Sequence, residues 1–214
     1  FSKLDLKVAK IVDVKNHPNA DKLYLIELDC GEKRRIVSGL KDFYSVDDLK
    51  GKNILLLYNL QPAKIRGEKS EGMLLAADTG DKIGLLFAEK SKPGDQVFVD
   101  GISNCSKQIS YKEFSEVKIK SENGKAYFEG KPLKTSSETV FVDKKVDGNI
   151  CWEHSFYWII ENYISEKLDY NLKEVVDLMR KEFFIVFLLM IQSVLAVNVD
   201  IEFLSHGAPI STVS

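Results

Sequence analysis

Short segments with alternating polarity, separated by turn residues, constrain the fold of this chain more than any other feature. Residues 6–15, LKVAKIVDVK, alternate between apolar and charged side chains. Their apolar face is predicted to consist of Leu6, Val8, Val12 and Val14. Further strands are predicted at residues 23–29, 34–38, 53–58, 72–77 and 96–99. Alternation with a period of two indicates half-buried strands, so the front of the chain is predicted to be all-β.

One short helix interrupts the strands. Residues 46–50 have helical character and stop at Gly51, between the third and fourth predicted strands. Short strands with turn signals every 8–12 residues are typical of a small closed barrel. The order permits a five-stranded Greek-key barrel of the oligonucleotide/oligosaccharide-binding (OB) type, although periodicity alone does not establish that topology.

Changes in composition divide the chain into three parts. Residues 1–100 are assigned to the barrel, and residues 101–150 to a β-rich extension packed on it. The strands expected in the extension are residues 110–120, 123–133 and 138–143, with turns at Asn123-Gly124 and Glu129-Gly130. Residues 151–214 are a tail that is either helical or unassigned. Its uncharged run, residues 183–199, is interpreted as a buried helix or strand, a membrane segment, or a tail not native to the domain.

Charge is distributed unevenly along the chain. The net charge is −2, but residues 1–150 carry 26 basic and 23 acidic side chains, whereas residues 151–214 carry 4 and 9. A mildly basic front is compatible with nucleic-acid binding. Because the chain begins with Phe1 rather than Met, we expect a fragment or a processed product.

The cysteines and histidines give no sign of a metal site or a disulfide framework. Cys30, Cys105 and Cys151 are far apart and form no CxxC motif, which favours reduced thiols in a cytoplasmic protein. No HExxH motif and no Cys/His cluster is present. We therefore expect no metal, no cofactor and no membrane partner.

A cationic loop provides the clearest functional signal from single residues. The segment NLQPAKIRG, residues 59–67, carries Lys64 and Arg66, is stiffened by Pro62 and ends at Gly67. Cations on a stiff loop over a small barrel can hold a phosphate backbone. A solvated basic loop with no ligand is the competing interpretation.

Two longer stretches connect this loop to a known family. Residues 4–40, with their HPNADKLY turn and VSGL segment, and residues 59–77, with NLQPAKIRG and SEGMLLAA, resemble the tRNA-binding domain of the endothelial monocyte-activating polypeptide II type. The resemblance implies an OB barrel that binds tRNA by shape, without catalysis. It also implies a partner synthetase or multisynthetase complex, and a monomer in which the extension takes the place of a second barrel.

The resemblance and the residue types together give a set of candidate tRNA contacts. They are Lys22, Arg34, Arg35, Lys64, Arg66, Ser70 and Met73, of which Lys22, Ser70 and Met73 fall on family positions linked to tRNA. Adjacent strand residues point to opposite sides, so one arginine of the pair at 34 and 35 is expected to be a surface charge. Met73 could equally belong to the core and Ser70 could cap the loop. Phe43 and Tyr44 could stack on bases or anchor their loop.

Three functions remain open from the sequence. The first is a non-catalytic tRNA-binding module that supports aminoacylation. The second is the C-terminal appendage of a tyrosyl- or methionyl-tRNA synthetase whose catalytic domain precedes Phe1. The third is a cytokine-like fragment, implied by the family and located at residues 6–12, which would have to be released from a buried strand. The chain carries no GxSxG elbow, and its acids are scattered, so hydrolase and transferase functions are not supported.

Overall fold

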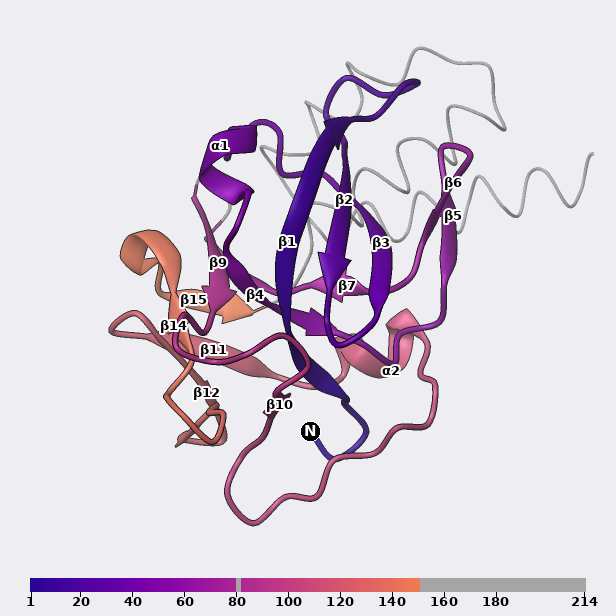
Figure 1. Ribbon diagram of the computed structural model, residues 1–214. Coiled ribbons are helices and arrows are strands. Elements are labelled where there is room, and N and C mark those ends of the chain that lie inside the picture. The colour runs from indigo at the N-terminus through magenta and orange to yellow at the C-terminus, as the bar shows by residue number, and fades with distance from the viewer. Residues whose placement is uncertain (80–81, 151–214) are drawn as a thin grey trace, which may run out of the picture. The chain divides into compact units, whose positions relative to one another are not determined.

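The computed structural model describes residues 1–79 and 82–150, which form strands around a shared core with two short helices (Figure 1). Thirteen strands join one sheet, and two more form a separate hairpin. The strands of the barrel region are β1 (Leu6–Asn16), β2 (Tyr24–Asp29), β3 (Lys33–Ser38), β4 (Asn53–Leu57), β5 (Ala63–Ile65), β6 (Glu68–Ser70), β7 (Met73–Leu74), β8 (Ala76–Asp78), β9 (Ile83–Phe87) and β10 (Gln96–Val97). The extension contributes β11 (Ile119–Glu122), β12 (Lys125–Phe128), β13 (Lys131–Pro132), β14 (Phe141–Val142) and β15 (Gly148–Ile150). The helices are α1 (Val46–Leu49), α2 (Tyr111–Ser115) and the 3-10 turn η1 (Asp143–Lys145).

Strand β1 pairs with three other strands of the barrel region. It pairs antiparallel with β4 along its first half and with β2 along its second half, and β10 pairs with its start. The register shifts between Ile11 and Asp13, which marks a β-bulge. Leu6 and Val8 are buried in one apolar cluster, whereas Ala9 and Ile11 are buried in the other, and Val12 at the bulge is 50% exposed. The prediction that Val12 belongs to the buried face was therefore wrong.

The barrel closes between β3 and the segment that leads into β7. Strands β2 and β3 pair along their whole length. The amide of Glu71 donates to the carbonyl of Arg35 at 2.9 Å, and β7 then pairs with β4 through Met73 and Leu57. The resulting order β1-β2-β3-β7-β4 confirms the Greek-key barrel. Strands β8 and β9 form a further hairpin beside β4, and β9 was not among the predicted strands.

Capping boxes start both helices. In α1 the Ser45 hydroxyl accepts from the Asp48 amide, and the Asp48 carboxylate accepts from the Ser45 amide. Ser110 and Glu113 form the same arrangement at the start of α2. The single strand predicted over residues 110–120 was therefore wrong in its first half, and only β11 follows the prediction. The sequence SYKE already carries the S-x-x-E signature of a helix start.

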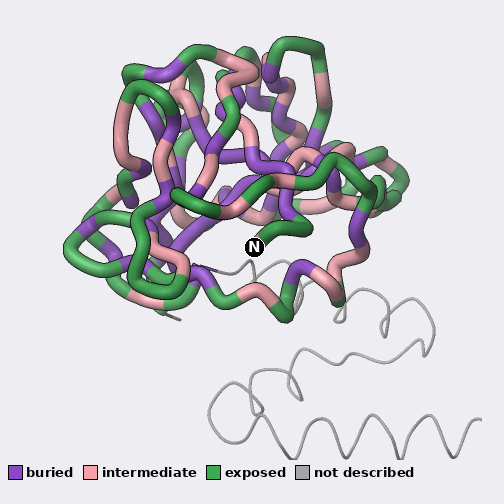
Figure 2. The backbone as a smooth tube through the Cα atoms, turned by 90° about the horizontal axis from the view of Figure 1, so that it is seen from below, coloured by how far each residue is buried: buried purple, intermediate pink, exposed green. Residues whose placement is uncertain are grey.

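The extension packs on the barrel through paired strands and a shared apolar core. Strand β15 pairs with β8, and β14 pairs with β9. One cluster of buried side chains includes Leu57 and Leu86 from the barrel together with Phe114 and Ile119 from the extension. Figure 2 shows buried residues, in purple, distributed along the described backbone. A side chain at Gly84 of β9 would overlap the carbonyl oxygen of Asp143, so glycine permits the close approach of the two regions.

Within the extension, the predicted turns are confirmed. Asn123-Gly124 and Glu129-Gly130 adopt positive φ and join β11 to β12 and β12 to β13. The strand expected at residues 138–143 is limited to β14. The tail predicted at residues 151–214 lies outside the described residues. In the part of the chain that is described, no helix has the length and apolarity needed to cross a bilayer.

Candidate nucleic-acid interface

The predicted cationic loop is a β-hairpin. Strands β5 and β6 pair with Ile65 opposite Glu68, which leaves Arg66 and Gly67 as a two-residue turn. Their φ angles are 49° and 93°, as a type I′ turn requires. Lys64 is exposed and forms no ion pair with another residue in the described ranges. We call residues 63–70 the cationic hairpin.

Lys22 lies on the loop between β1 and β2. Its amine is 3.6 Å from the carboxylate of Asp42, and both side chains are more than half exposed. The ion pair is weak, because water screens it on all sides. Figure 1 shows the β1–β2 loop at the upper end of β1 and β2, and the cationic hairpin beyond β3 with its turn toward the same end of the barrel. OB barrels bind oligonucleotides with this strand face and the loops beside it.

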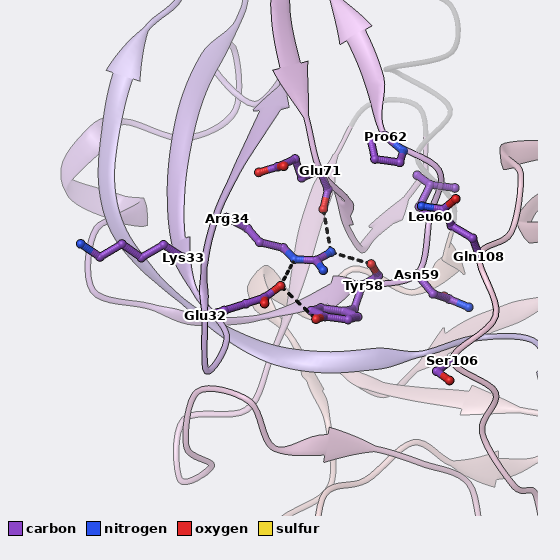
Figure 3. A pocket seen from close by; sticks show the side chains of 10 residues that line it. All are labelled: Glu32, Lys33, Arg34, Tyr58, Asn59, Leu60, Pro62, Glu71, Ser106 and Gln108. Carbon is purple, nitrogen blue, oxygen red and sulfur yellow. Dashed lines mark hydrogen bonds and ion pairs between the residues drawn. The ribbon is translucent and has the colours of Figure 1, made fainter.

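Arg34 is held inside the base of the cationic hairpin rather than facing solvent. Its side chain is only 20% exposed. Its Nη1 donates to the carbonyl of Tyr58 at 2.7 Å and to that of Glu71 at 3.1 Å, and its Nε donates to Glu32 at 2.7 Å. Figure 3 shows the guanidinium between these partners. The carbonyls of Tyr58 and Glu71 belong to the two ends of the excursion that carries the hairpin.

Tyr58 completes the packing around Arg34. The guanidinium carbon of Arg34 lies 3.5 Å from the centre of the Tyr58 ring, and the amine of Lys7 lies 3.4 Å from it. The Tyr58 hydroxyl donates to Glu32 at 2.9 Å. Hydrogen bonds from Arg34 and then Tyr58 hold the pKa of the Glu32 carboxyl below its usual value. The same bond from the tyrosine to Glu32 raises the pKa of Tyr58.

Arg35 points to the opposite side, as expected for the next residue of a strand. Its side chain is 48% exposed and lies 3.4 Å from the carboxylate of Glu27 and 3.5 Å from that of Glu68. These pairs attach the outer face of β2 to the cationic hairpin. A phosphate would have to compete with both carboxylates for this guanidinium.

Two of the candidate contacts serve the fold. The Ser70 hydroxyl is buried, accepts from the Val37 amide at 3.1 Å and donates to the Gly72 carbonyl at 3.2 Å. Met73 is half-buried and packs against both apolar clusters of the barrel. Among the candidate residues, Lys22, Lys64 and Arg66 are therefore exposed, whereas Ser70 and Met73 are held within the barrel.

Asn59, the first residue of the NLQPAKIRG segment, is a structural residue that the sequence analysis did not single out. Its buried side chain accepts from the Asp5 amide at 2.9 Å and donates to the carbonyls of Lys3 at 2.8 Å and Lys107 at 2.7 Å. Its own carbonyl accepts from the Ile109 amide at 2.9 Å. Asn59 thus joins the start of the hairpin to the segment that leads into the extension. Its position directly after a buried strand was the available signal.

A pocket of about 420 Å³ opens under the hairpin base (Figure 3). Its wall is mixed in charge, because Lys33 and Arg34 lie beside Glu32 and Glu71. Lys69 is the main cause that lowers the pKa of the Glu71 carboxyl. The exposed cations Lys22, Lys64 and Arg66 are absent from this wall, so the pocket is separate from the cationic end of the barrel.

The aromatic residues proposed for base stacking anchor their loop. Tyr44 is 3% exposed; its hydroxyl donates to the Ile83 carbonyl and accepts from the Leu85 amide. Burial is the main cause that raises the pKa of Tyr44. Phe43 packs against the same core. His17 is a turn residue, because its Nδ1 accepts from the Asn19 amide at 3.1 Å.

The chemistry that this surface offers is that of binding. Among residues 1–79 and 82–150 no group of three His, Cys, Asp or Glu side chains is placed to hold a metal. The first part of β1, to which the family resemblance gives a signalling role, is central to the barrel, and Leu6, Val8 and Ile11 are fully buried. The exposed cations beside β2 and β3 are therefore the groups best suited to contact a charged ligand.

A closed Greek-key barrel with cations on the loops beside its β2–β3 face defines this domain as an OB-type nucleic-acid-binding domain. Comparison with known families then gives the particular class. Residues 6–96 match the family described as "Putative tRNA binding domain", and this part of the chain belongs to that family. The family assignment confirms the prediction of a tRNA-binding domain in this part of the chain.

Two of the proteins similar to this chain are tRNA ligases. The methionine–tRNA ligase of Thermococcus onnurineus is 55% identical over 91 residues, which are 42% of this chain and 12% of the ligase. The cytoplasmic tyrosine–tRNA ligase of Xenopus tropicalis is 34% identical over 171 residues, which are 77% of this chain and 28% of the ligase. The chain therefore spans a minor part of the length of these ligases.

A solved structure resembles the barrel and the extension together. The C-terminal domain of Plasmodium vivax p43 superimposes with a TM-score of 0.65 at 26% identity. The match covers 69% of this chain and 97% of that domain.

Proposed function

We propose that this domain holds the folded backbone of tRNA with the cations at one end of its barrel and thereby supports aminoacylation by a synthetase. The contacts are Lys22 on the β1–β2 loop and Lys64 and Arg66 on the cationic hairpin. One observation carries the proposal: the β1–β2 loop and the turn of the cationic hairpin both extend toward the same end of the barrel (Figure 1). Duplex RNA hides its base edges, so such contacts read backbone and outline rather than sequence.

The lengths of the two ligase matches bear on the setting of the module. The match to the tyrosine–tRNA ligase spans 171 residues, whereas the match to the methionine–tRNA ligase spans 91, the size of the barrel domain alone. We place the module as an appendage of a synthetase of the tyrosyl type or in a cofactor protein that delivers tRNA, in the cytoplasm. Sequencing the transcript upstream of the codon for Phe1 distinguishes the two settings.

The state of assembly follows from the packed extension. Because the extension shares a core with the barrel, the apolar side chains on that face are already covered. We expect a monomer of the full chain at micromolar concentration in sedimentation equilibrium. A stable dimer would contradict this part of the proposal.

The test of the RNA contact is the dependence of tRNA affinity on salt. A protein that neutralises about four to six phosphates loses affinity with a slope of roughly 0.7–0.9 per phosphate in a plot of log affinity against log salt. Changing Lys64 and Arg66 together to Ala should lower the affinity about tenfold or more and the slope by about 1.4–1.8. All tRNA species should lose affinity alike.

A matched control removes two exposed lysines from the extension. Lys120 and Lys125 lie on β11 and β12, away from the hairpin in Figure 1. Changing both to Ala removes the same net charge and should leave the slope within experimental error. An equal loss in the control would mean that total charge, not the hairpin, governs binding. A loss confined to one tRNA species would contradict recognition of the outline.

A further inference from the structure

Arg34 and Asn59 hold the two sides of the base from which the cationic hairpin projects. Residues 58–71 leave the barrel after β4 and return to it before β7. Arg34 bridges the ends of this excursion through the carbonyls of Tyr58 and Glu71. Asn59 fixes the outgoing end to the carbonyls of Lys3 and Lys107.

The geometry of Arg34 is that of a brace and not of a ligand contact. Three of its hydrogen bonds end on groups of the protein, and one face of the guanidinium covers the Tyr58 ring. These bonds occupy Nε and Nη1, which leaves Nη2 as the nitrogen through which a phosphate could reach a side chain that is only 20% exposed. The neighbouring Arg35, with its longer ion pairs and 48% exposure, makes its side-chain contacts with carboxylates instead.

Further bonds fix the direction of the hairpin once its base is held. The Glu71 amide donates to the Arg35 carbonyl, and the Ser70 hydroxyl accepts from the Val37 amide. Strand β6 is thereby attached to β3. The bridge at Leu60 and Ile109 attaches the outgoing end to the segment before the extension.

We infer that Arg34 and Asn59 are positioning residues for tRNA binding: they clamp the base of the cationic hairpin, so that Lys64 and Arg66 face the RNA in a fixed direction. Because Asn59 donates to the Lys107 carbonyl, the segment that leads into the extension also belongs to this clamp. The inference rests on the proposed role of the hairpin cations and assigns the extension a part in aiming them. It removes Arg34 from the set of residues that touch RNA.

The first test separates charge from geometry. Arg34→Lys keeps the charge but cannot bridge two carbonyls while covering the Tyr58 ring. We expect it to lower tRNA affinity about tenfold. A direct phosphate contact would survive the change, so affinity equal to that of the wild type would overturn the inference.

The second test asks whether the clamp acts through the hairpin. Arg34→Lys is combined with Lys64→Ala and Arg66→Ala. Without the hairpin cations the clamp has no RNA contact to position. Adding Arg34→Lys should then lower tRNA affinity by less than about a further twofold. If the fold-losses of tRNA affinity from Arg34→Lys and from the two hairpin changes simply multiply, Arg34 acts independently of the hairpin and the inference fails.

Asn59→Asp provides a second clamp variant in case the arginine variant does not fold. The change keeps the acceptor for the Asp5 amide and removes the two donors to carbonyls. Its loss of affinity should also disappear when Lys64 and Arg66 are Ala. Ile119→Val, in the core of the extension, is the stability control, and it should lower the unfolding midpoint without changing tRNA affinity.

Hydrogen exchange tests the clamp without RNA. In either clamp variant the amides of β5 and β6 should exchange at least about tenfold faster, while those of β1 and β2 should not change. Unchanged exchange in the hairpin would overturn the clamp itself. If exchange rises but Lys64→Ala with Arg66→Ala leaves tRNA binding intact, the clamp stands and the proposed function fails.

Discussion

The turn of the cationic hairpin and its base use the same residue types for opposite purposes. In the hairpin, Lys64 on β5 and Arg66 in the turn are exposed. At the base, Arg34 is bonded to two carbonyls and a carboxylate and is one-fifth exposed. An exposed cation can pair with a charged ligand, whereas a cation that is bonded to acceptors of the protein stabilises the fold. The comparison shows that residue type alone does not decide whether a cation is exposed or bonded within the fold.

The largest expected difference between the two regions is in stability. Arg34→Ala removes the donors for two carbonyls and leaves Glu32 without its main partner, and the free energy of unfolding should fall by about 2 kcal/mol. Lys64→Ala should change it by less than about 0.5 kcal/mol. Urea denaturation of both variants measures this difference. Equal effects would remove the distinction between turn and base.

A change at the turn should separate stability from binding. Arg66 has a φ of 49°, a conformation that Asn adopts more readily than Arg. Arg66→Asn should raise the free energy of unfolding by about 0.5 kcal/mol. It should also lower tRNA affinity about fivefold, because a cation is lost. Thermal denaturation and a binding titration of one preparation give both values, and a parallel change in the two would argue against this role for Arg66.

The smallest expected effect is a dependence on pH at the base. The pKa of Glu32 and that of Glu71 are lowered in the folded protein, so their contribution to stability is complete above the usual carboxyl range near 4.5. It is lost as the pH falls below that range. The amides of β5 and β6 should exchange faster, relative to their intrinsic rates, between about pH 5 and pH 3. Glu32→Gln should reduce this dependence, and a variant with the full wild-type dependence would exclude Glu32 as its source.

Much of the fold could be predicted from the sequence because alternation and turn residues are local signals. Strands β2 and β3 follow their apolar period, and the turns at residues 123–124 and 129–130 follow their Asn-Gly and Glu-Gly pairs. The errors have local causes as well. Both faces of β1 are buried before the bulge, so Ala9 and Ile11 face the core and Val12 does not, and the capping signature at Ser110 was overlooked in a segment interpreted as a strand.

The candidate site was predictable only in its exposed half. Lys22, Lys64 and Arg66 lie on connections that turn residues mark in the sequence, and exposure suits them to contact a ligand. Nothing local distinguishes Arg34 from Arg35, or gives Ser70 its bonds to Val37 and Gly72. The distant partners are the decisive ones, because Glu71 lies 37 residues from Arg34 and Val37 lies 33 residues from Ser70.

The sequence by itself determined that this chain forms a barrel of short strands and carries cations on two of its connections, because strand period, turns and charge are properties of neighbouring residues. The tertiary structure decided which cations remain available. Closure of the barrel brought the carbonyls of Tyr58 and Glu71 to Arg34, and the segment leading into the extension brought those of Cys105 and Lys107 to Asn59. Hydrogen bonds between distant segments depend on the folded arrangement, and no periodicity in the chain encodes them.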